Sequence, residues 1–136
     1  MAIKAYMFFI MLVTAAIIIK ENKILIAKRK NMKWEFPGGR VEEGEKIEEC
    51  LKREIKEELD IEIEILSHFM KVCHEYDFGK IELHVFLARY KHGKEKAREH
   101  EEIRWMKIDE IDAYEFMEAD KKIVEEMKKR PHKIQI

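Results

Sequence analysis

The sequence has 136 residues, the length of one domain that can bury a proper core. Apolar residues make up 46% and charged residues 40% of the chain, which indicates a soluble globular protein with a densely charged surface. The net charge of −1 provides no global basic field, so composition argues against a protein that binds nucleic acid polymers.

Residues 1–19 are strongly apolar, and an anchor or a signal peptide has to be weighed against a strand. Only residues 5–19 are free of charge, which is short for a membrane span, and no small-residue cleavage site follows them. We therefore predict a buried strand over residues 11–19, within a single domain over residues 1–136. Residues 1–10 are a candidate N-terminal extension, with Met11 as an alternative native start and attachment to a membrane or partner as an alternative role.

Further strands are predicted from apolar runs and period-two alternation between turn signals. These segments are residues 24–27, 34–36, 61–66, 69–76, 80–90 and 103–106, of which 69–76 and 80–90 form a long hairpin. Residues 91–102 are almost wholly polar and predict a mobile loop. Residues 119–130 predict a final helix, which Pro131 ends.

Residues 34–61 carry the most informative pattern in the chain. A strand ends in a Pro-Gly-Gly turn, and a helix is predicted over residues 45–59. Its apolar positions recur every fourth residue, as a core-facing stripe does, at Ile47, Leu51 and Ile55. Strands with one helix after the third strand and another at the end indicate a three-layer α/β arrangement.

Three carboxylates break the amphipathic pattern of this helix. Glu54, Glu57 and Glu58 are predicted to converge on one edge of its buried side, where an ordinary helix would be apolar. Such a group repels itself unless a cation joins it, and clustered oxygen ligands suit Mg2+. Arg53 can pair with Glu57 one turn later and hold that carboxylate in place.

The stretch resembles the Nudix box, G-x5-E-x7-R-E-U-x-E-E-x-G-U, in which U is an aliphatic residue. The matching positions are Gly39, Glu45, Arg53, Glu54, Ile55, Glu57, Glu58 and Ile61. One position departs from the pattern, because Asp60 stands where the late glycine is expected. Asp tolerates the left-handed conformation, so we expect Asp60 to end the helix there. The resemblance implies a three-layer α/β/α sandwich with a mixed β-sheet.

The resemblance also implies the chemistry of the site. Mg2+, with Mn2+ as a substitute, would be held by Glu54, Glu57, Glu58 and the backbone carbonyl of Gly38. In similar enzymes a glutamate before the last strand reaches the metal and acts as general base, and the match here is Glu99. Glu101 and Glu102 are the alternatives. The implied catalytic residues are Arg53, Glu54, Glu57, Glu58 and Glu99, whereas Glu45 is interpreted as structural.

Outside the box the chain is similar to MutT-type hydrolases, including those that prefer cytidine triphosphate. The similar segments are ILIAKR at 24–29, WEFPGGR at 34–40 and EADKKIV at 118–124. Arg29, Phe36 and Asp120 would then face the base, and Gly39 and Arg40 the phosphates. The simpler alternatives are a core role for Phe36, a surface charge at Arg29 and a helix N-terminal acid at Asp120.

The implied activity is Mg2+-dependent hydrolysis of a (deoxy)nucleoside triphosphate to the monophosphate and pyrophosphate. The substrate would be an oxidised or modified nucleotide such as 8-oxo-dGTP, or CTP or dCTP, in nucleotide pool sanitation. Hydrolysis of ADP-ribose or dinucleoside polyphosphates, or a non-catalytic sensor, are the alternatives. We expect a cytoplasmic monomer or homodimer that binds nucleotides, without a membrane or a nucleic acid polymer as partner.

Cysteine and histidine add no further site. The two cysteines, Cys50 and Cys73, lie in no metal-binding spacing, and we expect both to be buried thiols in a reducing compartment. The six histidines form no ligand pattern and are expected on the surface or in strands.

Overall fold

The computed structural model describes residues 10–77 and 79–134, so most of the candidate extension at residues 1–10 lies outside the described residues. The elements in chain order are β1 (Ile10–Lys20), β2 (Lys23–Lys28), β3 (Trp34–Glu35), α1 (Ile47–Leu59), β4 (Glu62–Tyr76), β5 (Gly79–His92), β6 (Glu102–Lys107), the 3-10 helix η2 (Ile108–Ala113), α2 (Glu118–Lys129) and the 3-10 turn η3 (Pro131–Lys133).

One six-stranded mixed sheet forms the middle of the molecule. Its strand order is β3-β2-β1-β5-β4, and β6 pairs with β2 beside this path. The central strand β1 runs parallel to β5, from Ile10 beside Lys80 to Ile19 beside Arg89. The other strand pairs are antiparallel. The mixed sheet predicted from the resemblance is therefore confirmed.

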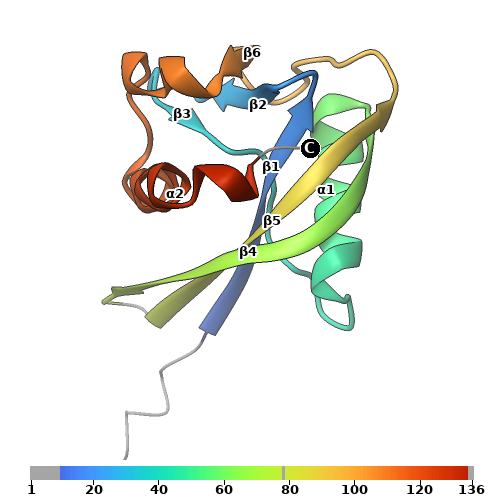
Figure 1. The fold of residues 1–136 in the computed structure, drawn as a ribbon. Coiled ribbons are helices and arrows are strands. Elements are labelled where there is room, and N and C mark those ends of the chain that lie inside the picture. The colour runs from blue at the N-terminus through green and yellow to red at the C-terminus, as the bar shows by residue number, and fades with distance from the viewer. Residues whose placement is uncertain (1–9, 78, 135–136) are drawn as a thin grey trace, which may run out of the picture.

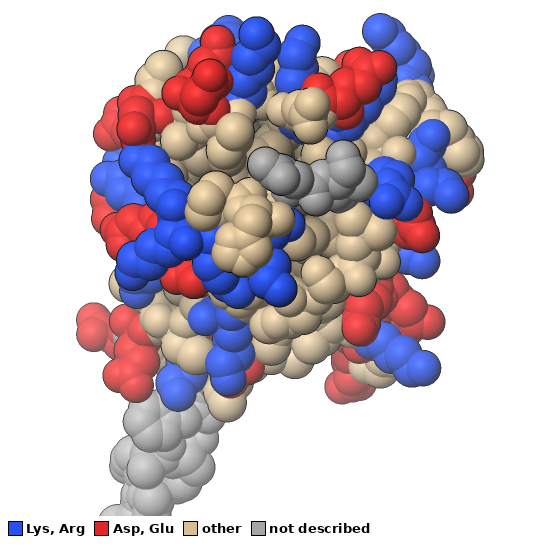
Figure 2. All heavy atoms as spheres, viewed as in Figure 1, with Lys and Arg blue, Asp and Glu red and all other residues tan. Residues whose placement is uncertain are grey.

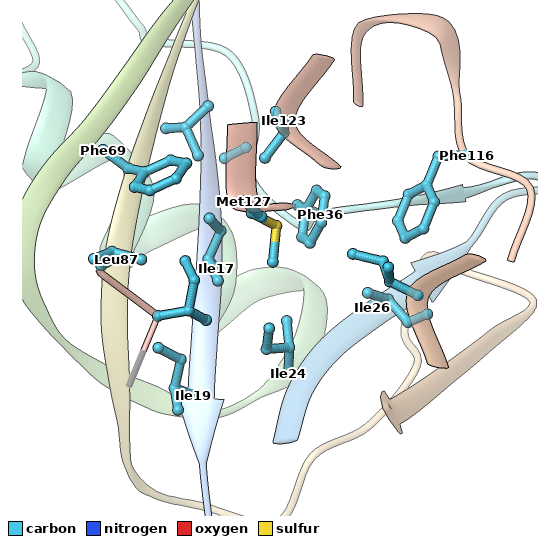
Figure 3. Packing of buried hydrophobic residues seen from close by; sticks show 14 of the residues in the cluster. Ile17, Ile19, Ile24, Ile26, Phe36, Phe69, Leu87, Phe116, Ile123 and Met127 are labelled. Carbon is cyan, nitrogen blue, oxygen red and sulfur yellow. The ribbon is translucent and has the colours of Figure 1, made fainter. Parts of the chain in front are cut away.

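The two long helices cover opposite faces of the sheet (Figure 1). Alternation along β1 decides which residue meets which helix, because successive side chains of a strand point to opposite faces. Ala15, Ile17 and Ile19 share one buried cluster with Ile123 and Met127 of α2 (Figure 3). The even-numbered neighbours enter a second cluster on the α1 side, which contains Ala16, Ile18, Leu51, Ile55 and Leu59. The predicted three-layer sandwich follows from this two-sided core.

The helix boundaries agree with prediction to within two residues. The helix predicted over 45–59 begins at Ile47, because Glu45 still belongs to a turn in which its N–H donates to the carbonyl of Glu42. At the other end Asp60 adopts the left-handed conformation, with φ 59° and ψ 35°, as expected. The C-terminal helix spans 118–129 where 119–130 was predicted.

Two predicted strands are one strand in the structure. Residues 61–66 and 69–76 were expected to be separate, but β4 runs without interruption from Glu62 to Tyr76. Register shifts next to Ile63, Ser67 and Met70 allow the whole strand to stay paired with β5. Such bulges place an extra residue in one strand, so the Ile/Glu alternation changes phase without ending the strand. The result is a single long hairpin.

Charges of both signs are interspersed over the face seen in Figure 2, in keeping with the net charge of −1. Lys and Arg side chains lie beside Asp and Glu, and surface formed by other residues separates the groups. Within the described ranges, no helix combines the length and the hydropathy that crossing a bilayer requires.

Candidate active site

Arg53 of α1 is the centre of an ion-pair network. Its Nε donates to Glu45 Oε2 at 2.6 Å, and its Nη1 donates to Glu54 Oε2 at 2.7 Å and to Glu57 Oε1 at 3.1 Å. Its Nη2 donates to the carbonyl of Arg40 at 3.2 Å. The hydrogen bond from Arg53 lowers the pKa of Glu45 to about 2. One guanidinium thus fixes carboxylates of the helix and the preceding turn, and the predicted pair with Glu57 is present.

Glu58, on the same helix, is buried, with 7% of its surface exposed. Its Oε1 is buried and has no hydrogen-bond partner among the described residues. Burial, together with a hydrogen bond and the charge of Glu54, raises the pKa of Glu58 to about 9. The charges of Glu99 and Glu35 act in the same direction. A buried carboxylate with an unpaired oxygen and acidic neighbours is a fitting ligand for a divalent cation.

The three predicted carboxylates do not share one direction. Glu54 lies close enough to Glu58 for its charge to act on that carboxyl group, whereas Glu57 is 55% exposed and pairs with Arg53. No group of three or more His, Cys, Asp and Glu side chains in residues 10–77 and 79–134 has the arrangement of a complete metal site. The acids therefore line one edge of α1, with Glu54 and Glu58 together and Glu57 apart.

The Pro-Gly-Gly turn holds the sheet against this helix. The carbonyls of Pro37 and Gly39 accept hydrogen bonds from Ala16 and Thr14 of β1, both at 2.8 Å. Because carbonyls alternate along an extended segment, the carbonyl of Gly38 between them faces away from β1. A Cβ at Gly38 would lie 2.0 Å from the carbonyl oxygen of Thr14, so this backbone can approach β1 only without a side chain.

Gly39 touches the acids directly. A Cβ added there would lie 2.1 Å from Glu54 Oε1. The glycine therefore leaves the space in which the Glu54 side chain lies. Its neighbour Arg40 is exposed and lines neither of the two cavities described below, although its carbonyl binds Arg53.

An acidic cavity of about 480 Å3 opens beside the buried carboxylate. Its lining residues are Arg29, Lys30, Asn31, Glu35, Glu58, Glu99 and His100. Among the three candidates for the general base, Glu99 lines this cavity. Glu102, the first residue of β6, instead pairs with Lys28 at 3.1 Å. Glu101 is exposed and does not line the cavity.

A second cavity of about 500 Å3, which we call the sheet cavity, lies between the sheet and the start of α2. Its lining residues are Val13, Thr14, Ala15, Arg29, Lys33, Glu35, Phe36, Gly38, Gly39, Val72, His74, Ile81, Leu83, Met117, Glu118, Ala119 and Asp120. Arg29 and Glu35 line both cavities, so the two adjoin. Four of the five residues predicted to bind substrate lie here, and Arg40 is the exception.

Phe36 and Asp120 are joined in the wall of the sheet cavity. The N–H of Phe36 donates to Asp120 Oδ1 at 3.1 Å, and the ring of Phe36 stacks on Phe116 with centroids 5.2 Å apart (Figure 3). Burial raises the pKa of Asp120 to about 7. Both are core residues that also face the cavity, so the core role considered for Phe36 and a role at the cavity are compatible.

Glu35 and His100 are site residues that sequence reasoning missed. The side chain of His100 is 6% exposed, its Nε2 lies 2.8 Å from Glu35 Oε2, and its Nδ1 is buried with no partner among the described residues. The expectation of a surface or strand histidine is therefore wrong at His100, which lies in a loop. Its pairing with a residue 65 positions away has no local signal. Likewise Cys73 is exposed, against expectation, whereas Cys50 is buried.

Comparison with known proteins places this fold and site in a family. The model of the NUDIX domain matches residues 11–127. The chain is 34% identical over 122 residues to an 8-oxo-dGTP diphosphatase of Buchnera aphidicola subsp. Schizaphis graminum, covering 86% of this chain and 92% of the relative. It is 35% identical over 118 residues to the CTP pyrophosphohydrolase of Escherichia coli, covering 83% and 87%.

The chain therefore belongs to the Nudix family. The solved structure of the E. coli ORF135 protein aligns with a TM-score of 0.83 at 32% identity, covering 91% of this chain and 92% of that one. Within the family the protein is a MutT-type pyrophosphohydrolase, as the resemblance of its box and flanking segments predicted.

Proposed function

We propose that the protein hydrolyses a (deoxy)nucleoside triphosphate to the monophosphate and pyrophosphate, with Mg2+ as its ion. The observation that carries this proposal is the buried, unpaired oxygen of Glu58, a residue that lies near Glu54 and that, like Glu99, lines the acidic cavity. The adjoining sheet cavity has the size of a small-molecule site. Together they offer one place for phosphates and one for a base.

The site residues have two kinds of role in this proposal: some bind the metal ion, and one accepts a proton. Glu54, Glu57, Glu58 and Glu99, with the carbonyl of Gly38, would hold Mg2+. When bound, this ion neutralises phosphate charge and lowers the pKa of a coordinated water.

Glu99 would accept the proton of the attacking water. Arg53 keeps Glu54 and Glu57 in place through its guanidinium. Gly39, where the turn borders the sheet cavity, would let the backbone approach the phosphates, and Arg40, which is exposed on the same turn and lines neither cavity, would contact them from outside.

The sheet cavity supplies base recognition in this proposal. Phe36 and Arg29 offer an aromatic ring and a cation in its wall, and Asp120 offers a carboxyl oxygen beyond the one that binds the Phe36 N–H. The relatives that act on 8-oxo-dGTP and on CTP suggest that the substrate is an oxidised purine or a cytosine nucleotide. Both present polar edges that a buried carboxyl can bind.

The test is a comparison of kcat/KM over a substrate panel with Mg2+. The panel holds 8-oxo-dGTP, dGTP, CTP, dCTP, 5-methyl-dCTP, ADP-ribose and diadenosine polyphosphates, with pyrophosphate and phosphate measured separately. We expect a triphosphate to be the best substrate and pyrophosphate to be the product. A preference for ADP-ribose or a dinucleoside polyphosphate would contradict the substrate class. Tight binding without turnover of any compound would instead favour a sensor.

A matched pair of variants links the activity to the site. Glu58→Gln removes a buried acid of the proposed metal site and should lower kcat by about a hundredfold or more. Glu48→Gln removes an exposed acid from the same helix and should leave kcat unchanged. Equal rates for the two variants would remove Glu58 from the mechanism.

A further inference from the structure

Asp60 occupies the position at which the Nudix box carries its late glycine. We propose that its carboxylate is a positioning device, which fastens the segment of residues 96–101 to the end of α1 and so holds Glu99 beside Glu58. This inference rests on the proposed function, in which Glu99 and Glu58 act together.

The conformation of Asp60 does not explain its carboxylate. The backbone is left-handed, and its N–H donates to the carbonyl of Lys56 at 3.0 Å as the end of the helix requires. A glycine meets both requirements at lower conformational cost. An anionic side chain is also unfavourable at a helix C-terminus, where the helix dipole is negative. The presence of a carboxylate at position 60 therefore needs an explanation other than the backbone conformation.

Three cations around Asp60 provide that reason. Its Oδ2 lies 3.3 Å from Arg98 Nη2 and 3.6 Å from Lys96 Nζ, and its Oδ1 lies 3.6 Å from Lys56 Nζ. Lys56 belongs to α1, whereas the other two belong to the loop between β5 and β6. The carboxylate is 27% exposed, and its three partners are 48–58% exposed, so the cluster lies at the surface and depends on several contacts acting together. It links the helix and the loop electrostatically.

The backbone of the same loop follows the end of the helix. The N–H groups of Lys96 and Arg98 donate to the carbonyls of Leu59 and Glu58 at 2.9 and 3.1 Å. Carbonyls in the last turn of a helix lack partners within it, so the loop supplies them. The bond from Arg98 ends on Glu58 itself, the residue whose side chain faces the acidic cavity.

Glu99 therefore lies between two fixed neighbours. Arg98 is bound to Asp60 and Glu58, and His100 is buried against Glu35. Glu99 is itself exposed, yet it lines the acidic cavity and its charge acts on Glu58. The backbone position of Glu99 is thus set by its two neighbours. Asp60 secures the side of the loop that faces the helix.

Two substitutions separate the carboxylate from the backbone conformation. Asp60→Asn keeps a residue that tolerates the left-handed region but removes the charge, and Asp60→Gly restores the residue of the box. Arg98→Gln removes the partner. Asp109→Asn serves as the control, because it removes an exposed acid outside the loop and the site.

We expect both Asp60 variants to lower kcat about tenfold with KM for the nucleotide nearly unchanged, and to weaken Mn2+ binding, followed by electron paramagnetic resonance, by a similar factor. Amide exchange of Lys96 and Arg98 should become about tenfold faster in both. The double variant Asp60→Asn/Arg98→Gln should be no worse than the poorer single variant, because the two residues act as one unit. Asp109→Asn should match the wild type in all readouts.

A purely structural cap predicts a different result, because Asp60→Gly would then keep wild-type kcat, Mn2+ affinity and loop exchange. That result, or additive effects of Asp60→Asn and Arg98→Gln, would overturn the inference. Wild-type protein that hydrolyses none of the triphosphates would instead overturn the proposed function. Amide exchange and Mn2+ affinity would still test the role of Asp60 in that case.

Discussion

Glu58 combines burial with three acidic neighbours, and this makes its ionisation costly. Its folded-state pKa of about 9 lies above the ordinary value of 4.5. Between these values the folded protein holds a proton that the unfolded chain has lost. The free energy of unfolding must therefore fall as pH rises through this window, provided that no cation binds.

We predict from this that the Tm of the protein in EDTA falls between pH 5 and pH 9, and that Glu58→Gln reduces the fall. At pH 8 the variant should melt above the wild type, because the wild type must take up a proton at Glu58 on folding, whereas the neutral amide of the variant carries no such cost. Calorimetry over a pH series measures both curves. Parallel curves for wild type and variant would show that Glu58 is not the titrating group.

Asp120 is a second buried acid. Its structural role, accepting the hydrogen bond of the Phe36 N–H, can be tested separately from its proposed role in binding the base. Asp120→Ala should cost about 1–3 kcal/mol of stability, because it leaves a buried N–H without an acceptor. Asp120→Asn keeps an acceptor oxygen and should cost less than about 1 kcal/mol, yet it changes the group offered to the base. Urea unfolding gives the stabilities and kcat/KM ratios give the base preference. Unchanged ratios in the Asn variant would exclude base recognition by Asp120.

The Pro-Gly-Gly turn joins β1 to the acids of α1, and its two glycines have different neighbours. Gly38→Ala should destabilise the protein by about 3 kcal/mol, because its Cβ meets the rigid backbone of β1 at Thr14. Gly39→Ala should cost about 1 kcal/mol or less, because its Cβ meets the movable end of Glu54.

Of these two variants, Gly39→Ala should lose more activity than Gly38→Ala, once kcat is corrected for the folded fraction. Gly39→Ala displaces Glu54 and should lower kcat about tenfold or more at nearly native stability. Urea unfolding combined with kcat measurements tests both statements. Equal losses of stability in the two variants would show that the contacts at Gly38 and Gly39 are equivalent.

The sequence predicted helices and strands well where their buried residues recur at a regular spacing. The spacing of Ile47, Leu51 and Ile55 placed α1, and all but Ile47 are completely buried. The late position of the box predicted the left-handed end at Asp60. The division of β4 into two strands was wrong, because register shifts are set by the partner strand and leave only a phase change in the sequence. Pairing partners, unlike periods, are not encoded locally.

The candidate site likewise contains residues that local sequence predicted and residues that it did not. The box indicated which acids lie on α1, and the spacing indicated the Arg53–Glu57 pair, but neither indicated that Glu58 would be buried while Glu57 stays 55% exposed. Glu35 and His100 escaped prediction because they meet only after β3 and the loop before β6 are brought together. Tertiary packing decides such contacts, and neither residue stands in a spacing that distinguishes it.

Binding of the proposed ion should be visible in the stability of the entire domain. A cation that binds only the folded state at a hundred times its Kd adds about 2.7 kcal/mol, or about 10 °C in Tm for a chain of this length. We predict this rise on replacing EDTA with saturating Mg2+ at pH 8. Glu58→Gln should lose most of it, and Glu48→Gln should retain it. Thermal melts that do not respond to Mg2+ or Mn2+ would contradict the proposed site.

The two adjoining cavities have a consequence for how such an enzyme diverges. Substitutions at Phe36, Val72 or Asp120 change one cavity and leave the acids untouched, so they offer routes by which lineages acquire new nucleotide preferences. Arg29 and Glu35 line both cavities, so they cannot be substituted without changing the acidic cavity as well. We expect a mutation at either one to change both selectivity and turnover, so that it would have to be accompanied by compensating changes elsewhere.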